Sequence, residues 1–206
     1  VSSVIREMER AVFTYNTGFI NFEDENLSVN RKWFCTLLKT IKERFKGYKI
    51  ELRAMNGLFP QTLDGETIFE MKQAGFKTLN LSLGTTIPEQ FKRFQRIDVR
   101  KAFDRAVKLA EAHDLDAVGY VIAGAPYQNA SDSVADLLYL AQRRVLIGVS
   151  IFYPAPGSDD YRLCERLHIL PESYHQMRAS ALPLSHTTSR TDAATLMRLG
   201  RILNFI

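Results

Sequence analysis

Three consecutive acidic residues are the clearest candidates for chemistry in this sequence. Glu23, Asp24 and Glu25 directly follow a short apolar run at residues 19–22. Carboxylates this close together repel each other unless a cation is nearby, so the segment suits an ammonium group, a sulfonium group or a metal ion. The alternative is an acidic helix start before Asn30, because carboxylates favour the N-terminal end of the helix dipole. The sequence alone leaves both interpretations open.

Polar residues also follow the next two apolar runs. Asn56 and Gly57 follow the second run, where they can simply form a turn. Ser82 lies in the third run, and Arg93 and Arg96 come after it in a helix-like stretch. A guanidinium group can hold a carboxylate through two parallel N–H donors, although arginines on a surface are the commoner explanation.

The fourth and fifth runs end in small and aromatic residues. Ala123 and Gly124 precede Pro126, and glycine lets a flat ligand approach the backbone while proline fixes the turn. A tight structural turn explains the same residues. Tyr153 begins a rigid loop over residues 153–158 that can form the wall of a pocket or only cover the rim of a barrel.

Five β-branched or apolar runs provide the strands that would position these residues. They recur about every 30 to 40 residues, which is the length of one strand, one helix and two loops. Such crossovers produce parallel strands, so the predicted class is α/β. No Gly-rich phosphate loop follows the first run, which favours a partial parallel, TIM-barrel-like (β/α) barrel of about five to six strands over a doubly wound sheet. The expected strands are residues 19–22, 49–53, 78–83, 116–122 and 148–152.

Helix signals lie between the expected strands. Asp64 can cap a helix that Gly75 closes, and Ser131 can cap a later one. The stretch 99–113 places its apolar residues on one face, as in a helix packed on a sheet. The expected helices are residues 65–74, 99–113, 132–144 and 191–205.

The regular pattern weakens after Pro154, where further prolines interrupt the chain. We therefore predict a partial barrel over residues 1–160 that lacks its first strand. A helical extension over residues 161–206 is expected to pack on it.

Composition excludes several classes of protein. The chain has 206 residues, 46% of them hydrophobic and 24% charged, with a formal net charge of +4, which is typical of one globular domain. No apolar run approaches the roughly 18 residues of a membrane span, so a cytoplasmic location is expected. The basic residues are spread along helices such as 39–49 without interleaved aromatic residues, which indicates solvated helix faces and makes nucleic-acid binding the less favoured interpretation.

The sequence offers no metal or nucleophile motif. Its cysteines, Cys35 and Cys164, are far apart and lie in helix-like stretches, as expected for buried thiols in a reducing compartment. His113 ends its helix, where an imidazolium suits the dipole. Metal-dependent hydrolysis and a serine triad therefore lose support.

Taken in order, these segments resemble the radical S-adenosylmethionine (radical SAM) superfamily, and most closely the branch whose members often carry a cobalamin-binding domain before the barrel. The resemblance covers nearly the whole chain and depends on five segments in the family's order. They are residues 20–26 (INFEDEN), 56–76 (from NGL to MKQAGF), 81–96 (from LSLG to FKRFQR), 119–126 (GYVIAGAP) and 152–158 (FYPAPGS).

The resemblance implies roles for seven cofactor-binding residues. Asp24 and Glu25 stand where acids bind the amino group of S-adenosylmethionine, and Ser82 and Arg96 where polar groups meet its ribose and carboxylate. Ala123 and Gly124 would offer backbone to the adenine ring, with Tyr153 beside it. If the fold is a parallel barrel, Asp24, Glu25, Ser82, Arg96 and Gly124 are expected around one ligand.

Two features depart from the family pattern. Family members usually have Glu two residues after the glycine of the fourth family strand, whereas this chain has Thr86, which puts one ribose or substrate contact in doubt. The chain also lacks the Cys-x-x-x-Cys-x-x-Cys loop whose thiolates hold a [4Fe–4S] cluster. Because residues 1–14 resemble the helix that follows this loop, we expect a chain truncated just after it.

The resemblance implies a parent enzyme that uses the cluster to cleave S-adenosylmethionine reductively into methionine and a 5′-deoxyadenosyl radical. Such a parent would need an electron donor and a small-molecule substrate, with cobalamin bound by an absent domain, and the chain alone would be inactive. The alternative is a non-catalytic barrel module that binds a nucleotide-like ligand or a protein partner. An exposed edge of the first strand would favour dimers through strand pairing.

Overall fold

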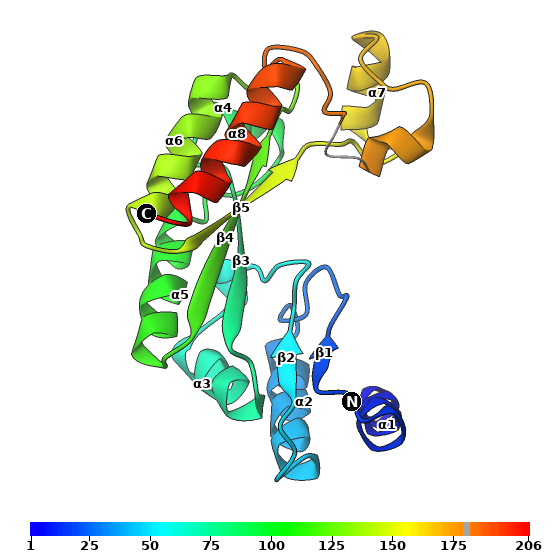
Figure 1. Ribbon diagram of the computed structural model, residues 1–206, viewed down its shortest axis with the longest axis vertical. Helices are drawn as coiled ribbons and strands as arrows, with labels where there is room; N and C mark the ends of the chain where they lie inside the picture. The colour runs from blue at the N-terminus through cyan, green and yellow to red at the C-terminus, as the bar shows by residue number, and fades with distance from the viewer. Residues whose placement is uncertain (179–181) are drawn as a thin grey trace. The chain divides into compact units, whose positions relative to one another are not determined.

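The computed structural model of the protein describes residues 1–178 and 182–206 (Figure 1). Helices and strands alternate along most of the chain, which confirms the predicted α/β class. The helices are α1 (Ser2–Glu9), α2 (Arg31–Arg44), α3 (Gly65–Ala74), α4 (Pro88–Arg93), α5 (Arg100–Ala112), α6 (Ala130–Ala141), α7 (Asp159–Arg166) and α8 (Arg190–Leu203). The strands are β1 (Phe19–Asn21), β2 (Glu51–Arg53), β3 (Thr78–Gly84), β4 (Asp116–Ala123) and β5 (Leu146–Ile151). A π-helical turn (Arg10–Thr14) follows α1, and 3₁₀ turns cover Pro60–Thr62 and Tyr174–Arg178.

The strands form two parallel sheets with the orders β1-β2 and β3-β4-β5. In the first sheet, Ile20 lies opposite Leu52. Parallel bridges join Leu52 to Phe76 and Leu58 to Leu81, so the chain around β2 also pairs with the segment that leads into β3. All five expected strands are present, while a barrel of five to six strands stays a prediction.

The chain divides into two compact units. Unit 1 contains Val1–Leu83 and Val99–Gly119, and unit 2 contains Gly84–Asp98 and Tyr120–Ile206. This division follows the packing of the chain and does not test the domain boundary predicted at residue 160.

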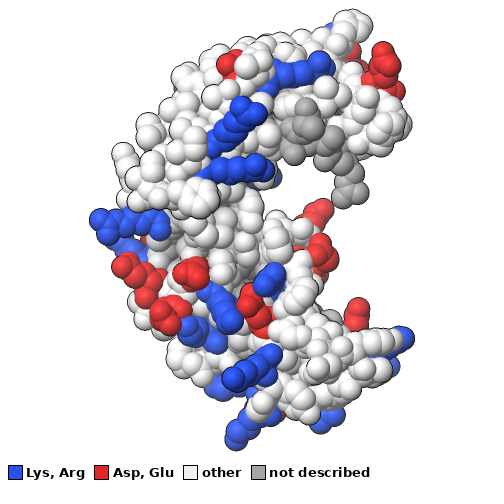
Figure 2. Space-filling view, in the orientation of Figure 1, with Lys and Arg blue, Asp and Glu red and all other residues white. Residues whose placement is uncertain are grey.

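Unit 1 is built around the apolar face of α2. This helix begins after Asn30, whose side chain accepts a hydrogen bond from the Trp33 backbone N–H, and it packs beside α3 (Figure 1). The outer surface of unit 1 carries mixed charges, which Figure 2 shows over α3 and α5 as neighbouring basic and acidic side chains. Several are paired, including Arg31 with Asp64 at 2.7 Å. The core includes Phe34, Leu37, Leu38, Ile41, Ile68, Met71 and Phe76.

In unit 2, helices α6 and α8 lie side by side against β5 (Figure 1). The contact is close at Gly200, because a Cβ atom added there would lie 2.8 Å from a Val149 methyl group. Ser189 caps α8 through a capping box with Asp192. The expected last helix is therefore confirmed as α8, which packs on β5. Residues 179–181 of the predicted extension lie outside the described residues.

The helix ends show where the sequence signals succeeded. Asp64 caps α3 by accepting a hydrogen bond from the Thr67 N–H at 2.8 Å, and Gly75 ends it in the left-handed conformation, as predicted. The prediction that Ser131 caps the helix expected at residues 132–144 was wrong. The cap of α6 is Asn129, which forms a reciprocal capping box with Asp132. Three residues after Ser131 the chain has Val134, which cannot form such a box. None of the described helices is long and apolar enough to cross a membrane.

Candidate functional site

The loop after β1 is held to the loop after β2 by one glutamate. The Glu23 side chain accepts hydrogen bonds from the side-chain amides of Asn21 and Asn56, and the second is 3.3 Å long. Asn56 also donates to the Glu23 carbonyl at 2.7 Å, and the Met55 N–H donates to the Asn21 side chain at 3.0 Å. Glu23 is therefore a structural residue, which the sequence did not distinguish from its two acidic neighbours.

Asp24 and Glu25 differ from Glu23 because their side chains are exposed and unpaired. Among the described residues, neither carboxylate has a hydrogen-bond or ion-pair partner. The alternative of an acidic helix start was wrong, since α2 begins at Arg31 and has no acidic residue in its first turn. The two carboxylates are thus available to a cation that the described residues do not supply.

Ser82 lies beside the turn that follows β2. The side chain is half-buried on β3, and its Oγ occupies the space that a side chain at residue 57 would need. Gly57 has φ +101°, so it is a turn glycine as predicted, and its missing side chain leaves room for the hydroxyl group. Within unit 1, the turn at Gly57 therefore leaves the space that the Ser82 hydroxyl group occupies.

Arg96 is a cation of unit 2 whose side chain has no partner among the described residues. Its guanidinium group lies over the backbone of Gly84, where a Cβ atom would be only 3.4 Å from the arginine nitrogen. Gly84 has φ +79°, which favours glycine and keeps this approach open. Within the described chain, Arg96 forms no ion pair or hydrogen bond through its side chain.

Arg96 lines a pocket of about 320 Å³ in unit 2. Tyr153, another predicted site residue, lies on the same pocket, and its hydroxyl group donates a hydrogen bond to the Leu182 carbonyl. Burial raises the pKa of this tyrosine. The pocket volume falls in the range of small-ligand sites, which is about 300 to 1,000 Å³. The remaining lining residues are Phe94, Ile122, Ser150, Ile151, Phe152 and Asp160.

A second arginine, Arg93, contacts two residues that line this pocket. Arg93 is mostly buried, forms an ion pair with Asp160 at 3.3 Å and lies 4.4 Å from the centre of the Phe94 ring. Burial lowers its pKa, while the nearby Asp160 carboxylate opposes that shift. The two arginines that the sequence offered as carboxylate ligands therefore differ, because Arg93 already has a carboxylate partner and Arg96 does not.

The residue that departs from the family pattern has a structural partner. Thr86 is buried, and both its N–H and its hydroxyl group donate to one oxygen of Asp136, at 2.5 and 2.6 Å. Asp136 is fully buried on α6, and this desolvation raises the pKa of its carboxyl group to about 6. Thr86 thus anchors the short turn before α4, the helix that precedes Arg96, and its side chain is used in this contact.

Ala123 and Gly124 are buried at the end of β4. The Ala123 carbonyl accepts a hydrogen bond from the Phe152 N–H at 2.9 Å, so it takes part in strand pairing. Gly124 has φ +81°, and Ile122 immediately before this pair lines the pocket. The structure therefore brings Arg96 and Tyr153 to one pocket and leaves the roles of Ala123 and Gly124 as predictions.

The cysteines do not form a metal site. Cys35 and Cys164 are both buried and unpaired, on α2 and α7. Burial raises the pKa of the Cys164 thiol to about 11, which disfavours the thiolate that binds metals. In the described residues, no group of three or more His, Cys, Asp and Glu residues could hold a metal ion.

Comparison of the sequence with protein families finds no matching family, and comparison with curated proteins finds no match. Solved structures do match the fold. The radical SAM methyltransferase TsrM from Kitasatospora setae, solved with cobalamin and a [4Fe-4S] cluster, has a TM-score of 0.69 and 15% identity over 84% of this chain and 35% of its own.

Two further structures are similar. Coproporphyrinogen III oxidase (HemN) from Escherichia coli, a radical SAM enzyme, has a TM-score of 0.54 and 16% identity over 81% of this chain and 36% of its own. Methylornithine synthase (PylB) has a TM-score of 0.53 and 15% identity over 91% of this chain and 54% of its own. The chain thus has the radical SAM fold and spans between a third and a little over half of the length of these proteins.

Proposed function

We propose that this chain, whose fold is that of radical SAM enzymes, is the S-adenosylmethionine-binding part of such an enzyme. Its strands would form part of the parallel (β/α) barrel. The parent protein would act on a small molecule with electrons from a donor, and cobalamin would be bound outside these residues. The substrate of that reaction is not assigned by any residue of this chain.

The observation that carries the proposal is the unpartnered guanidinium group of Arg96 on a ligand-sized pocket. A charged group on a pocket without a counter-ion favours an anionic ligand, and the planar fork of arginine matches a carboxylate. The aromatic rings of Phe94, Phe152 and Tyr153 on the same pocket suit a flat ring system. S-adenosylmethionine carries both a carboxylate and an adenine ring.

The proposal gives each residue a limited task. In unit 2, Arg96 would bind the carboxylate and Tyr153 would lie beside the adenine, with the backbone of Ala123 and Gly124 behind the ring. For Asp24, Glu25 and Ser82, which belong to unit 1, contacts to the ammonium group and the ribose stay predictions from the resemblance. These groups bind and orient the ligand, and none of them is proposed to transfer a proton.

The fold family implies a [4Fe–4S] cluster, but the residues present here do not fit it. Cluster ligands are thiolates, whereas Cys164 is buried with a raised pKa and Cys35 is buried in α2. Neither unit offers a group of three or more potential metal ligands among its described residues. We therefore assign the cluster no residue of this chain, and expect the chain alone to bind S-adenosylmethionine without cleaving it.

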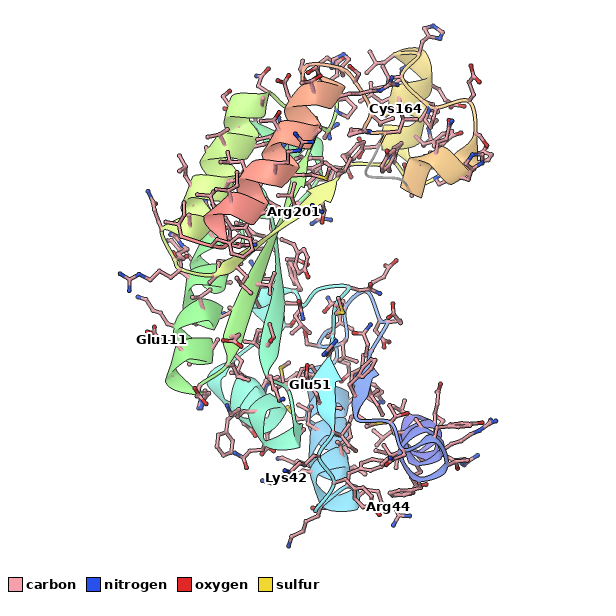
Figure 3. All side chains as sticks on the ribbon, viewed as in Figure 1. Lys42, Arg44, Glu51, Glu111, Cys164 and Arg201 are labelled. Carbon is pink, nitrogen blue, oxygen red and sulfur yellow. The ribbon has the colours of Figure 1, made fainter. Side chains whose placement is uncertain are left out.

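Calorimetry with S-adenosylmethionine and the Arg96→Ala variant tests the proposal. Loss of a hydrogen bond between charged groups costs about 1.5 to 3 kcal/mol, so affinity is expected to fall about 10- to 150-fold. Methylthioadenosine lacks the amino-acid part, and its affinity should be unchanged by the substitution. Arg201→Ala is the matched control, because Arg201 is an exposed arginine of unit 2 on α8 (Figure 3).

Two results would refute this assignment. Equal losses for Arg96→Ala and Arg201→Ala would mean that only net charge matters. Equal losses for S-adenosylmethionine and methylthioadenosine would mean that Arg96 does not bind the carboxylate. If the chain binds other nucleosides as tightly as S-adenosylmethionine, the alternative of a module for nucleotide-like ligands is favoured.

A further inference from the structure

One pocket of unit 1 has five lysines among its sixteen lining residues. It has a volume of about 640 Å³ and lies between the C-terminal ends of α2 and α3 and the start of β2. Lys42, Lys46 and Lys49 line it from one segment, and Lys72 and Lys77 line it from another about 25 residues later. Figure 3 shows Lys42 near the end of α2 and Glu51, the only acidic lining residue, on β2.

Three of these five lysines have no partner. Lys77 forms an ion pair with Glu51 at 3.2 Å, and Lys72 with Asp114 at 3.0 Å. The Glu51 carboxylate is further neutralised by Arg53 at 2.7 Å, and these bonds lower its pKa. In the described part of the chain, the ammonium groups of Lys42, Lys46 and Lys49 have neither an ion-pair nor a hydrogen-bond partner.

Helix dipoles explain only some of this charge. A lysine in the last turn of a helix stabilises the free carbonyl groups there, which accounts for Lys42 on α2 and Lys72 on α3. Lys46 and Lys49 lie beyond the last residue of α2, in the loop before β2. The helix dipole therefore does not explain why Lys46 and Lys49 line the pocket.

An exposed aromatic ring accompanies the unpaired lysines. Tyr48 lines the pocket with 56% of its surface exposed, and its ring centre lies 5.1 Å from that of Phe13. Phe13 is itself packed against Phe45 at 5.6 Å. The expectation that no basic cluster is interleaved with aromatic residues was wrong, because Lys46, Tyr48 and Lys49 lie together in one loop, and folding adds the Phe13 ring beside Tyr48. The supported ring of Tyr48 is suited to stack on a flat base.

We propose that this lysine pocket binds the phosphate and the base of a nucleotide, which is either free or at the end of a nucleic acid. Lysine suits phosphate as a compact point charge, and no arginine, the better match for a planar carboxylate, is among the described lining residues. Lys46 and Lys49 would neutralise the phosphate, and Tyr48 would stack on the base. This inference is independent of the proposed S-adenosylmethionine site.

The test is calorimetry on the full chain, with S-adenosylmethionine in excess to occupy any adenosyl site. The probes are ADP, inorganic pyrophosphate and a short oligothymidylate. We expect Lys46→Ala/Lys49→Ala to weaken ADP binding about tenfold, since two exposed ion pairs are lost. Higher salt should weaken binding of all three probes by screening. Lys101→Ala/Lys108→Ala is the matched control, because both lysines are exposed on α5 of the same unit.

Tyr48→Ala tests the stacking part, with Tyr48→Phe as the variant that keeps the ring. ADP should bind more tightly than pyrophosphate to the wild type, and Tyr48→Ala but not Tyr48→Phe should remove that difference. Tighter binding of the oligothymidylate or of ADP identifies the natural source of the phosphate. The proposal is overturned if pyrophosphate and ADP bind equally, if no probe binds, or if the control pair weakens binding as much as Lys46→Ala/Lys49→Ala.

Discussion

The two pockets both carry cations without partners, but they hold them in different ways. In unit 2, the exposed Arg96 guanidinium lies near the bare backbone of Gly84, on a pocket that aromatic rings also line. In unit 1, Lys46 and Lys49 are flexible, exposed side chains in a loop. A rigid fork selects a planar carboxylate by geometry, whereas flexible ammonium groups select mainly by charge. Substitutions that alter the support of a pocket should therefore affect the Arg96 pocket and not the lysine pocket.

The largest effect is expected at Asp136, which anchors the loop before Arg96. Asp136→Ala removes the acceptor for the Thr86 N–H and hydroxyl group and leaves both buried without partners. We expect the free energy of unfolding to fall by about 3 kcal/mol and S-adenosylmethionine binding to weaken. Chemical denaturation measures the first quantity and calorimetry the second. Pyrophosphate binding at the lysine pocket should be unchanged at temperatures where the variant is folded.

Asp136→Asn is the control, since its side-chain oxygen can still accept both hydrogen bonds. The pKa of Asp136 is raised to about 6 by burial, so the folded protein holds this proton more tightly than the unfolded chain. Its contribution to stability is therefore present below about pH 4 and is lost as pH rises through about 6. The stability of the wild type relative to Asp136→Asn should fall across that window. A pH-independent difference would contradict the buried, titrating carboxyl group.

A smaller effect is expected where Gly84 lets Arg96 approach. Gly84→Ala adds a Cβ atom 3.4 Å from the guanidinium group and strains a backbone at φ +79°. The strain should lower stability by about 1 kcal/mol, and the shifted guanidinium should weaken S-adenosylmethionine binding several-fold. Gly157→Ala is a close match, because Gly157 has φ +83° in the same unit but nothing within 4 Å of the added atom. Its stability should fall equally while its ligand affinity stays that of the wild type. Equal affinity losses would show that the position of Arg96 is not what Gly84 protects.

How much the sequence predicts depends on whether the signal is local. The strands and the caps of α3 were predicted correctly because periodicity and capping act within a few residues. The pairing of Glu23 with Asn56, of Arg93 with Asp160 and of Thr86 with Asp136 was not predicted, because the partners lie far apart in the sequence. One signal was present for Asp136, since an acid on the apolar face of α6 must be buried with a donor. The lysine pocket also had a local signal, the cluster of Lys46, Tyr48 and Lys49 in one loop, whereas Lys72 and Lys77 join it only through folding.

The smallest effect is expected for Asp24→Asn/Glu25→Gln in unit 1. These carboxylates are exposed, and among the described residues they have no partner to lose, so stability should change by less than about 0.5 kcal/mol. An exposed ion pair contributes about 0.2 to 1 kcal/mol, so S-adenosylmethionine should bind up to about fivefold more weakly. Glu111→Gln/Asp116→Asn removes two exposed acids from the same unit and should leave affinity unchanged. The wild-type preference for S-adenosylmethionine over an analogue without the amino group should shrink only in the Asp24→Asn/Glu25→Gln variant. An unchanged preference would show that neither acid contacts the ammonium group.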